Sequence, residues 1–187
     1  MGTAAGNTAA QLAARTARGL GRAIDRIGQV TAWLMLALVL LVAGNVLGRY
    51  LLGFSSVAAQ ELEWHLLVPI ALLGLAYGIR RGGHVRVDVF YEHFGTRLQA
   101  AVDLLTALLT LLFALVAIQL SIPYVEQAYW IGEGSPDPGG LPHRFIIKGC
   151  LPIGFLLLAL QGLQMALESA LRLAGRDREA ATAAGHR

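Results

Sequence analysis

The fold of this chain is decided by residues 58–94, which read AAQELEWHLLVPIALLGLAYGIRRGGHVRVDVFYEHF. The apolar run 62–79 is long enough, as a helix rising about 1.5 Å per residue, to cross a bilayer core of roughly 30 Å. Glutamates and a tryptophan lie at the start of this run, at positions 61, 63 and 64, and the pair Arg80-Arg81 closes it. We therefore predict a membrane-spanning helix with charged ends, around which the rest of the chain packs.

The composition indicates a membrane protein of one compact unit. The 187 residues are 56% hydrophobic and only 14% charged, whereas soluble domains carry about a quarter charged residues. The net charge of +3 does not indicate nucleic acid as a partner, because the arginines lie at the ends of apolar runs. The single cysteine, Cys150, excludes enzymes that need a cysteine pair.

Four apolar runs predict an all-α membrane protein with four transmembrane helices in a domain over residues 27–167. The spans are expected at about 27–47, 62–79, 98–124 and 145–167. Residues 1–26 are expected to form a disordered cytoplasmic tail, and residues 168–187 a frayed, charged cytoplasmic tail.

The connections between the spans carry turn and capping signals. Ser55 or Ser56 is expected to cap the second span. Residues 125–144 are expected to form a turn-rich loop, because residues 135–140 read SPDPGG. Lys148, early in the fourth span, is expected to reach the interface.

The polar connection 80–97 has a period-two pattern from His84 to Val89 that by itself indicates a strand. A lone strand at a membrane surface would leave its backbone groups unpaired. We therefore expect a short interfacial amphipathic helix between spans two and three, capped by Asp88. Thr96-x-x-Gln99 is expected to be the capping box that begins span three.

Lys and Arg are distributed unequally between the two ends of the predicted spans. Twelve of the fifteen lie in the two tails and in the connection 80–97, and the other three are Arg49, Arg144 and Lys148. The positive-inside rule then places both termini in the cytoplasm.

Two pairs of glycines, Gly44 with Gly48 and Gly74 with Gly78, have the small-xxx-small spacing that lets helix backbones approach closely. They indicate tight packing of the first two spans.

The chemistry of transport or catalysis is expected to lie outside this chain. No span has an ionisable residue near its centre, and the sequence has no phosphate-binding loop, paired acid site or metal-ligand spacing. Glu61 and His65 share a helix face, either to bind a partner or as ordinary interfacial polarity. Haem ligation is disfavoured, because His65, His84, His93 and His143 are all expected near interfaces.

Several motifs, in this order, resemble the small membrane subunit (DctQ type) of tripartite ATP-independent periplasmic (TRAP) transporters. They are Gln60-Glu61-Leu62-Glu63-Trp64, Gly74 with Gly78, the run RRGGHVRVD at 80–88, Gly140-Leu141-Pro142, and Leu151-Pro152-Ile153-Gly154-Phe155. The resemblance covers nearly all of the chain except its tails.

This resemblance implies a subunit without enzymatic activity or cofactor in the bacterial inner membrane. Such a subunit has four spans and packs against a large multi-span subunit (DctM type) that binds substrate and sodium. It enlarges the fixed scaffold and helps to dock a periplasmic substrate-binding protein (DctP type). The sodium gradient then drives uptake of organic acids, commonly carboxylates.

The residues expected to contact these partners come from the motifs and from the glycine pairs. They are Gly44, Gly48, Glu61, Trp64, His65, Gly74, Gly78, Arg81, His84, Arg86, Asp88, Leu141, Pro142, Lys148 and Pro152.

Three other functions remain open from the sequence. The first is a stand-alone small proton-coupled transporter that uses Glu61 or Glu63 as proton carrier. The second is a haem-binding or quinone-linked electron-transfer bundle, and the third is an assembly factor for another membrane complex.

Bulky replacements at Gly44, Gly48, Gly74 and Gly78 are expected to lower the yield of an assembled membrane complex, because a large side chain prevents close approach of helices. The measurement is the amount of complex recovered per amount of expressed chain. Normal yield from the variant that carries all four replacements would contradict the prediction.

Overall fold

The computed structural model describes residues 2–83, 91 and 93–174, with side chains from Ala10 onward. Its helices are α1 (Gly2–Leu52), α2 (Val57–Arg80), α4 (Thr96–Trp130) and α5 (Phe145–Leu173). All four are long and apolar enough to cross a membrane, which confirms the prediction of a helical protein with four candidate spans. Most of the predicted interfacial helix, including His84, Arg86 and Asp88, lies outside the described residues.

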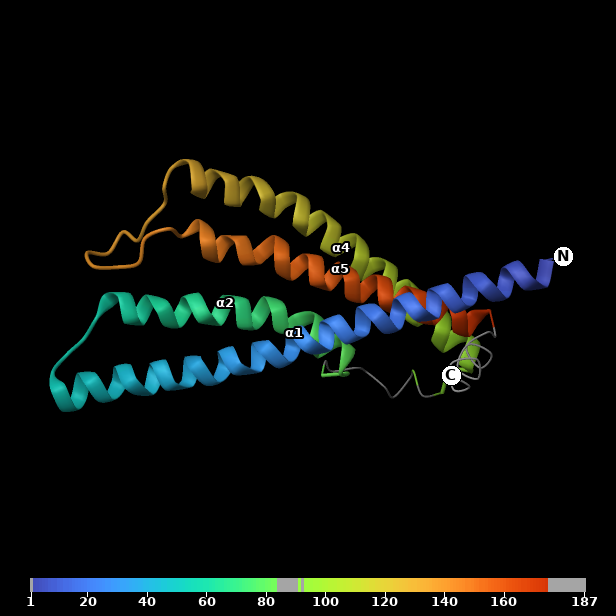
Figure 1. Ribbon diagram of the computed structural model, residues 1–187, viewed down its shortest axis with the longest axis horizontal. Coiled ribbons are helices and arrows are strands. Elements are labelled where there is room, and N and C mark those ends of the chain that lie inside the picture. Colours follow the sequence, from blue (N-terminus) through green and yellow to red (C-terminus); the bar gives the residue numbers. More distant parts are fainter. Residues whose placement is uncertain (1, 84–90, 92, 175–187) are drawn as a thin grey trace.

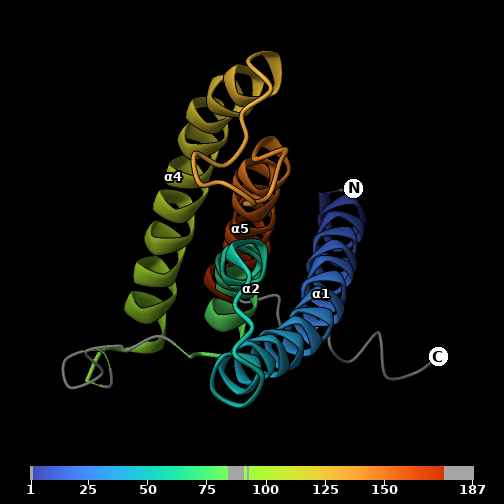
Figure 2. The same cartoon turned by 90° about the vertical axis from the view of Figure 1, so that its left-hand side faces the viewer.

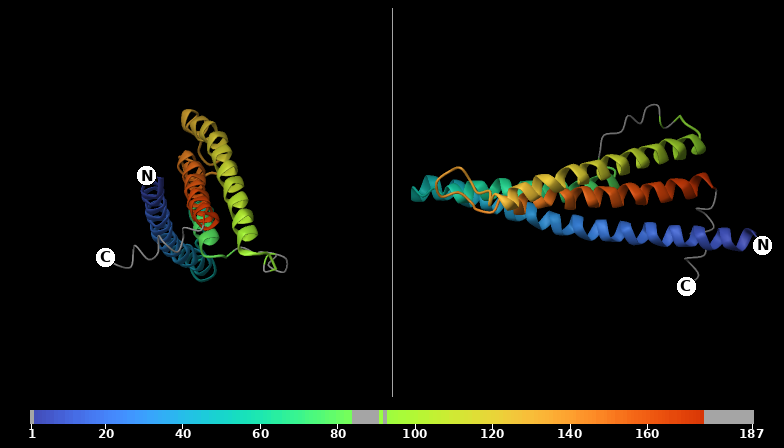
Figure 3. Two further views of the ribbon diagram at one scale, coloured as in Figure 1. Left: turned by 90° about the vertical axis from the view of Figure 1, so that its right-hand side faces the viewer. Right: turned by 90° about the horizontal axis from the view of Figure 1, so that it is seen from above.

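Helix α5 lies at the centre of the arrangement. It packs against α1, α2 and α4, while α1 also packs against α2. Consecutive helices run in opposite directions, so that the start of α1 and the end of α5 lie at the same end of the molecule (Figure 1). Helices α4 and α1 flank α5 on opposite sides (Figures 2 and 3).

The packing of α4 on α5 depends on small side chains. Every seventh residue of α4 is buried, and these residues are Ala100, Ala107, Ala114, Ser121 and Ala128. On the facing side of α5, a Cβ at Gly162 would lie 3.1 Å from the Leu111 nitrogen and 3.2 Å from the Ala107 oxygen. The two backbones therefore approach closely, as small residues allow in membrane helices.

Helix α1 begins at Gly2, so the expectation of a disordered tail over residues 1–26 is wrong in this structure. The buried positions in its first half recur every three or four residues, at Ala10, Ala14, Ala17, Gly21, Ile24, Gly28 and Thr31. Ile24 packs with Ala76 of α2 and Leu157 of α5. This buried stripe keeps the segment helical, since most helical stability comes from packing of one face.

The predicted glycine pairs are not the points of close approach between α1 and α2. A Cβ at Gly44 or Gly78 would meet nothing within 4 Å, and at Gly74 only Thr31 Cγ2 at 3.8 Å. At Gly48 it would meet only the Phe54 oxygen, at 3.7 Å. The close approaches of α1 are at Gly21, against the Arg80 guanidinium, and at Gly28, against the Tyr77 ring.

The helix starts agree only in part with the sequence prediction. Ser56, one of the two predicted serines, caps α2 by accepting from the Ala59 nitrogen at 3.4 Å. The capping box of span three is wrong: the N-cap is Gly95, and the Gln99 side chain donates to the Tyr91 carbonyl at 3.0 Å.

The last two helices are longer than their predicted spans. Helix α4 continues through Pro123 to Trp130, so the loop begins six residues later than the predicted start at residue 125. Helix α5 runs to Leu173, so the predicted frayed tail is helical up to that residue.

Gly154→Ala is expected to lower the free energy of unfolding in detergent by about 1–3 kcal/mol, as overpacking of a close contact does. The added Cβ would lie 2.6 Å from the Leu72 Cβ and 3.2 Å from the Leu72 carbonyl carbon. The measurement is thermal unfolding followed by circular dichroism.

The matched control is Gly149→Ala in the same helix, where an added Cβ meets nothing within 4 Å. It is expected to leave stability unchanged or to raise it, because alanine favours the helix more than glycine does. Equal unfolding temperatures for the two variants would contradict the prediction.

Candidate functional site: the loop bound to Glu61

The carboxylate of Glu61 holds the loop of residues 131–144 against α2. Glu61 lies in the second turn of α2 and is only 7% exposed. Its carboxylate accepts hydrogen bonds from the Ser135 hydroxyl and from the Leu141 nitrogen, the latter at 2.6 Å. The guanidinium of Arg144 lies 3.4 Å from the same carboxylate. An acceptor-only group on α2 is thus matched by three donors from one loop.

The loop is also closed by its own backbone. The Gly140 nitrogen donates to the Asp137 oxygen at 3.0 Å, with Gly139 at φ 80°. Pro138 in the second position and a glycine with positive φ in the third are typical of a type II turn. Two further bonds, Ser135 nitrogen to Leu141 oxygen at 3.1 Å and Arg144 nitrogen to Glu133 oxygen at 2.8 Å, join the two sides of the loop.

Gly140 is required where the loop meets α2. A Cβ at this position would lie 2.8 Å from the Glu61 Oε2 atom and 2.5 Å from the Ser135 Cβ. Any side chain would therefore displace the hydroxyl or the carboxylate that form the contact.

Two further polar contacts join the helices at this end of the molecule. Lys148 of α5 pairs with Glu133 of the loop, and its Nζ lies 3.9 Å from the centre of the Tyr124 ring. The Asn45 amide of α1 donates to Glu63 of α2 at 2.9 Å. Lys148 therefore has a specific partner within the chain, while its place at the membrane interface stays a prediction.

His65 and Glu61 share a helix face, but their side chains do not pair. The Nδ1 atom of His65 lies 2.7 Å from the Glu61 carbonyl oxygen, while the carboxylate faces the loop. Trp64 is 71% exposed on the surface of α2.

Charged residues at the other end of the molecule also bind one another. Asp25 of α1 pairs with Arg80 at 3.1 Å and with Arg81 at 3.4 Å. Asp103 of α4 accepts from the Tyr91 hydroxyl at 2.9 Å and lies 3.7 Å from Arg172 of α5.

The remaining predicted contact residues lie apart from Glu61. Pro142 is exposed in the loop beside Leu141. Pro152 lines an apolar groove of about 250 Å³ between the end of α4 and the start of α5, together with Tyr129, Trp130 and Phe145. Among the described residues, no group of three or more His, Cys, Asp or Glu is placed to hold a metal ion.

Sequence reasoning missed three of the residues that form this site. Ser135, Glu133 and Arg144 fall within the predicted turn-rich loop, where the sequence assigns them no partner. The sequence signal was the SPDPGG run, which requires a tight turn. Nothing local in the sequence pairs that turn with Glu61, because the two are 74 or more residues apart.

Comparison with known proteins gives a consistent set of similarities. A family model described as tripartite ATP-independent periplasmic transporters, DctQ component, matches residues 38–172. The ectoine TRAP transporter small permease protein TeaB of Halomonas elongata is 31% identical over 162 residues, covering 84% of this chain and 81% of the relative.

Two further relatives are C4-dicarboxylate TRAP transporter small permease proteins named DctQ. The protein of Vibrio cholerae is 28% identical over 170 residues, covering 76% of this chain and 73% of the relative. The protein of Rhodobacter capsulatus is 33% identical over 124 residues, covering 66% of this chain and 54% of the relative. These relatives are transporter permease subunits and not enzymes.

Glu61→Ala is expected to accelerate hydrogen–deuterium exchange of the Leu141 amide by about tenfold or more, since that amide loses its acceptor. Exchange in the middle of α4 serves as the internal reference. Glu126→Ala, which removes an exposed carboxylate near the end of α4, is the control and should leave the Leu141 amide unchanged. Slow exchange at Leu141 in the Glu61 variant would contradict the assigned contact.

Proposed function

We propose a function from one premise, which is that this chain belongs to the DctQ component family of tripartite ATP-independent periplasmic (TRAP) transporters. The chain is a small permease component of such a transporter and is not an enzyme. Its proposed role is to form the fixed scaffold on which a large multi-span subunit of the DctM type moves substrate. A periplasmic binding protein of the DctP type delivers that substrate.

The observation that carries the scaffold role is the pairing of charged groups between helices at both ends of the molecule. Asp25 binds the end of α2 from α1, Asp103 lies near Arg172 of α5, and Glu61 binds the α4–α5 loop. A membrane transporter that acts alone needs ionisable groups near the bilayer midplane. Here the described ion pairs lie near the ends of α2 and α5, and Asp25 provides its carboxylate from the middle of α1. Contacts at both ends of these two helices suit a rigid frame.

The exposed apolar faces of α1 and α4 support a role in binding other membrane components. Helix α4 packs mainly on α5, and large apolar side chains such as Leu105, Leu109 and Leu112 are exposed on it. Gly44 and Gly78 have open space around them within this chain. We propose that the large subunit approaches at these glycines, while lipid covers the remaining apolar surface.

The proposed orientation places the Glu61 loop on the periplasmic side of the bacterial inner membrane. The start of α1 and the end of α5 lie together at the opposite end of the molecule (Figure 1). That end carries most of the Lys and Arg residues, so the positive-inside rule favours cytoplasmic termini. A loop closed by its own backbone and held by Glu61 would then offer a fixed surface to a periplasmic binding protein.

The proposed substrate class is organic acids, with uptake driven by the sodium gradient. Relatives are named for ectoine and for C4-dicarboxylates. The stand-alone proton-carrier alternative is disfavoured, because Glu61 is bound by the loop and Glu63 accepts from Asn45.

Purification of the tagged chain from its native membrane in mild detergent is expected to recover a larger membrane protein of many spans in equal amount. Proteoliposomes holding both proteins and the binding protein should accumulate a labelled organic acid when an inward sodium gradient is applied. The measurements are the stoichiometry of the purified complex and the initial rate of uptake.

Control proteoliposomes distinguish a scaffold subunit from a transporter that works alone. Proteoliposomes with this chain alone should show only background uptake with either a sodium or a proton gradient. Uptake by the chain alone would overturn the scaffold role, and recovery of the folded chain without any larger partner would argue against the complex.

A further inference from the structure

The first half of α1 carries a row of arginines on one side, which we call the arginine stripe. Its members are Arg15, Arg18, Arg22 and Arg26, and all four are exposed. They are spaced by three, four and four residues, and such spacings keep side chains on one side of a helix. The arginine stripe faces away from the buried stripe of α1. This alignment depends on the helix, and the expected disordered tail would not have produced it.

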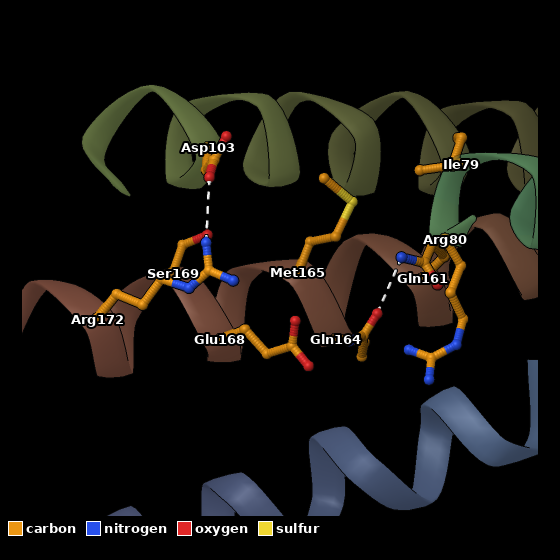
Figure 4. Close-up of a pocket in the computed structure, with 9 residues that line it drawn as sticks. All are labelled: Ile79, Arg80, Asp103, Gln161, Gln164, Met165, Glu168, Ser169 and Arg172. Atoms are coloured by element: carbon orange, nitrogen blue, oxygen red, sulfur yellow. Dashed lines mark hydrogen bonds and ion pairs between the residues drawn. The ribbon is translucent and has the colours of Figure 1, made fainter. Parts of the chain in front are cut away.

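The arginines of α2 and α5 at the same end of the molecule have carboxylate partners within the chain. Arg80 binds Asp25 at 3.1 Å, and Figure 4 shows Arg172 joined to Asp103 between α5 and α4. The arginine stripe, by contrast, makes no ion pair with any residue that the structure describes. Four positive charges on α1 are therefore left without a counter-charge from the described chain.

Uncompensated arginines at this spacing repel one another. Like charges three or four residues apart destabilise a helix. Among the described residues, the only hydrogen bond of the stripe side chains runs from the Arg22 Nε atom to the Arg18 carbonyl oxygen, at 3.4 Å. An anionic surface outside the chain would remove the repulsion and would supply acceptors for the guanidinium groups.

The contact between α1 and α2 shows where the stripe lies relative to a bilayer. Asp25, between Arg22 and Arg26 in the sequence, binds Arg80 at the end of α2. Helix α2 has 24 residues and is apolar enough to span a membrane, so its ends lie where lipid headgroups begin. Arg22 and Arg26 are then level with the headgroups, and the other two arginines lie one to two turns further from the bilayer.

The side of α1 that carries the arginines continues into an apolar surface. Trp33, Leu36 and Leu40 follow Arg26 at helical spacing and are 71%, 47% and 64% exposed. A lipid whose acyl chains cover these side chains has its headgroup beside the inner arginines of the stripe. The apolar surface and the charged surface therefore fit the two parts of one lipid layer.

We propose that the arginine stripe binds the headgroups of anionic phospholipids in the membrane around α1. The guanidinium groups donate hydrogen bonds to phosphate oxygens, and the net negative charge of the lipid adds an attraction that a zwitterionic headgroup lacks. This attraction falls off over about 8 Å at physiological salt, so the inner pair, Arg22 and Arg26, contributes more than the outer pair. The proposal requires a bilayer but neither the large subunit nor a particular orientation.

The test measures which lipids surround the stripe in the full-length chain, through quenching of Trp33 fluorescence by lipids with brominated acyl chains. Trp64 and Trp130 are 71% and 81% exposed, so Trp64→Phe and Trp130→Phe leave Trp33 as the only tryptophan without disturbing a core. The vesicles contain equal amounts of phosphatidylglycerol and phosphatidylcholine, and only one of the two is brominated in each sample. The ratio of the two quenching values gives the local enrichment.

Phosphatidylglycerol is expected to be enriched beside Trp33 about fivefold over phosphatidylcholine at low salt, which is the attraction of one arginine near an anionic surface. The enrichment should decrease as salt is added. Arg22→Gln combined with Arg26→Gln is expected to abolish most of it. Arg15→Gln combined with Arg18→Gln removes the same charge further from the bilayer and should retain more than half.

Two controls separate charge from structure and place the effect on α1. Arg22→Lys combined with Arg26→Lys keeps both cations and should keep the enrichment. A chain with Trp130 as its only tryptophan reports on the opposite end of the molecule and should show little enrichment. Circular dichroism of each variant checks that the helices are retained.

Three outcomes would overturn the proposal. They are equal quenching by the two lipids beside Trp33, an unchanged enrichment after Arg22 and Arg26 are replaced by glutamine, and the same enrichment beside Trp130. If the glutamine variant instead loses a co-purifying membrane protein at unchanged lipid enrichment, the stripe binds a protein and not lipid. Failure of the lipid test leaves co-purification of the unaltered chain with a large subunit unaffected, so the two proposals are tested separately.

Discussion

The carboxylate of Glu61 is the contact through which α2 holds the connection between α4 and α5. It accepts from Ser135 and Leu141 and lies beside Arg144, all in one loop. A carboxylate that is largely removed from water needs several donors, because an uncompensated charge there is unfavourable. The loop cannot leave α2 without exposing this charge and three donors together. The turn at residues 137–140 and the absence of a side chain at Gly140 bring the donors within reach.

The helices themselves pack through small residues rather than large ones. Helix α4 buries Ala100, Ala107 and Ala114 against α5, and Gly162 is the small residue of α5 that faces them. In a bilayer, lipid tails are as apolar as leucine, so helices associate through close van der Waals contact and not through removal of apolar surface from water. Large apolar side chains remain exposed on α1 and α4.

These two features suit a frame better than a moving part. Ion pairs and hydrogen bonds lie near both ends of α2 and α5, while small residues hold α4 close to α5. Such a frame is what the proposed scaffold role requires.

The sequence alone was enough to predict the four helices, their charged ends, a serine cap at position 55 or 56, and the family resemblance. Hydropathy, capping residues and turn residues act over a few positions, so they can be read locally. The spacing of Gly44 with Gly48, by contrast, indicates only that a neighbouring helix backbone could approach α1 closely at that point. Which helix face meets which neighbour is a property of the assembled chain, and the contact fell at Gly21 and Gly28 instead. Likewise, the partners of Glu61 become visible only in the folded chain, because they lie 74 to 83 residues away and no local pattern encodes such a pairing.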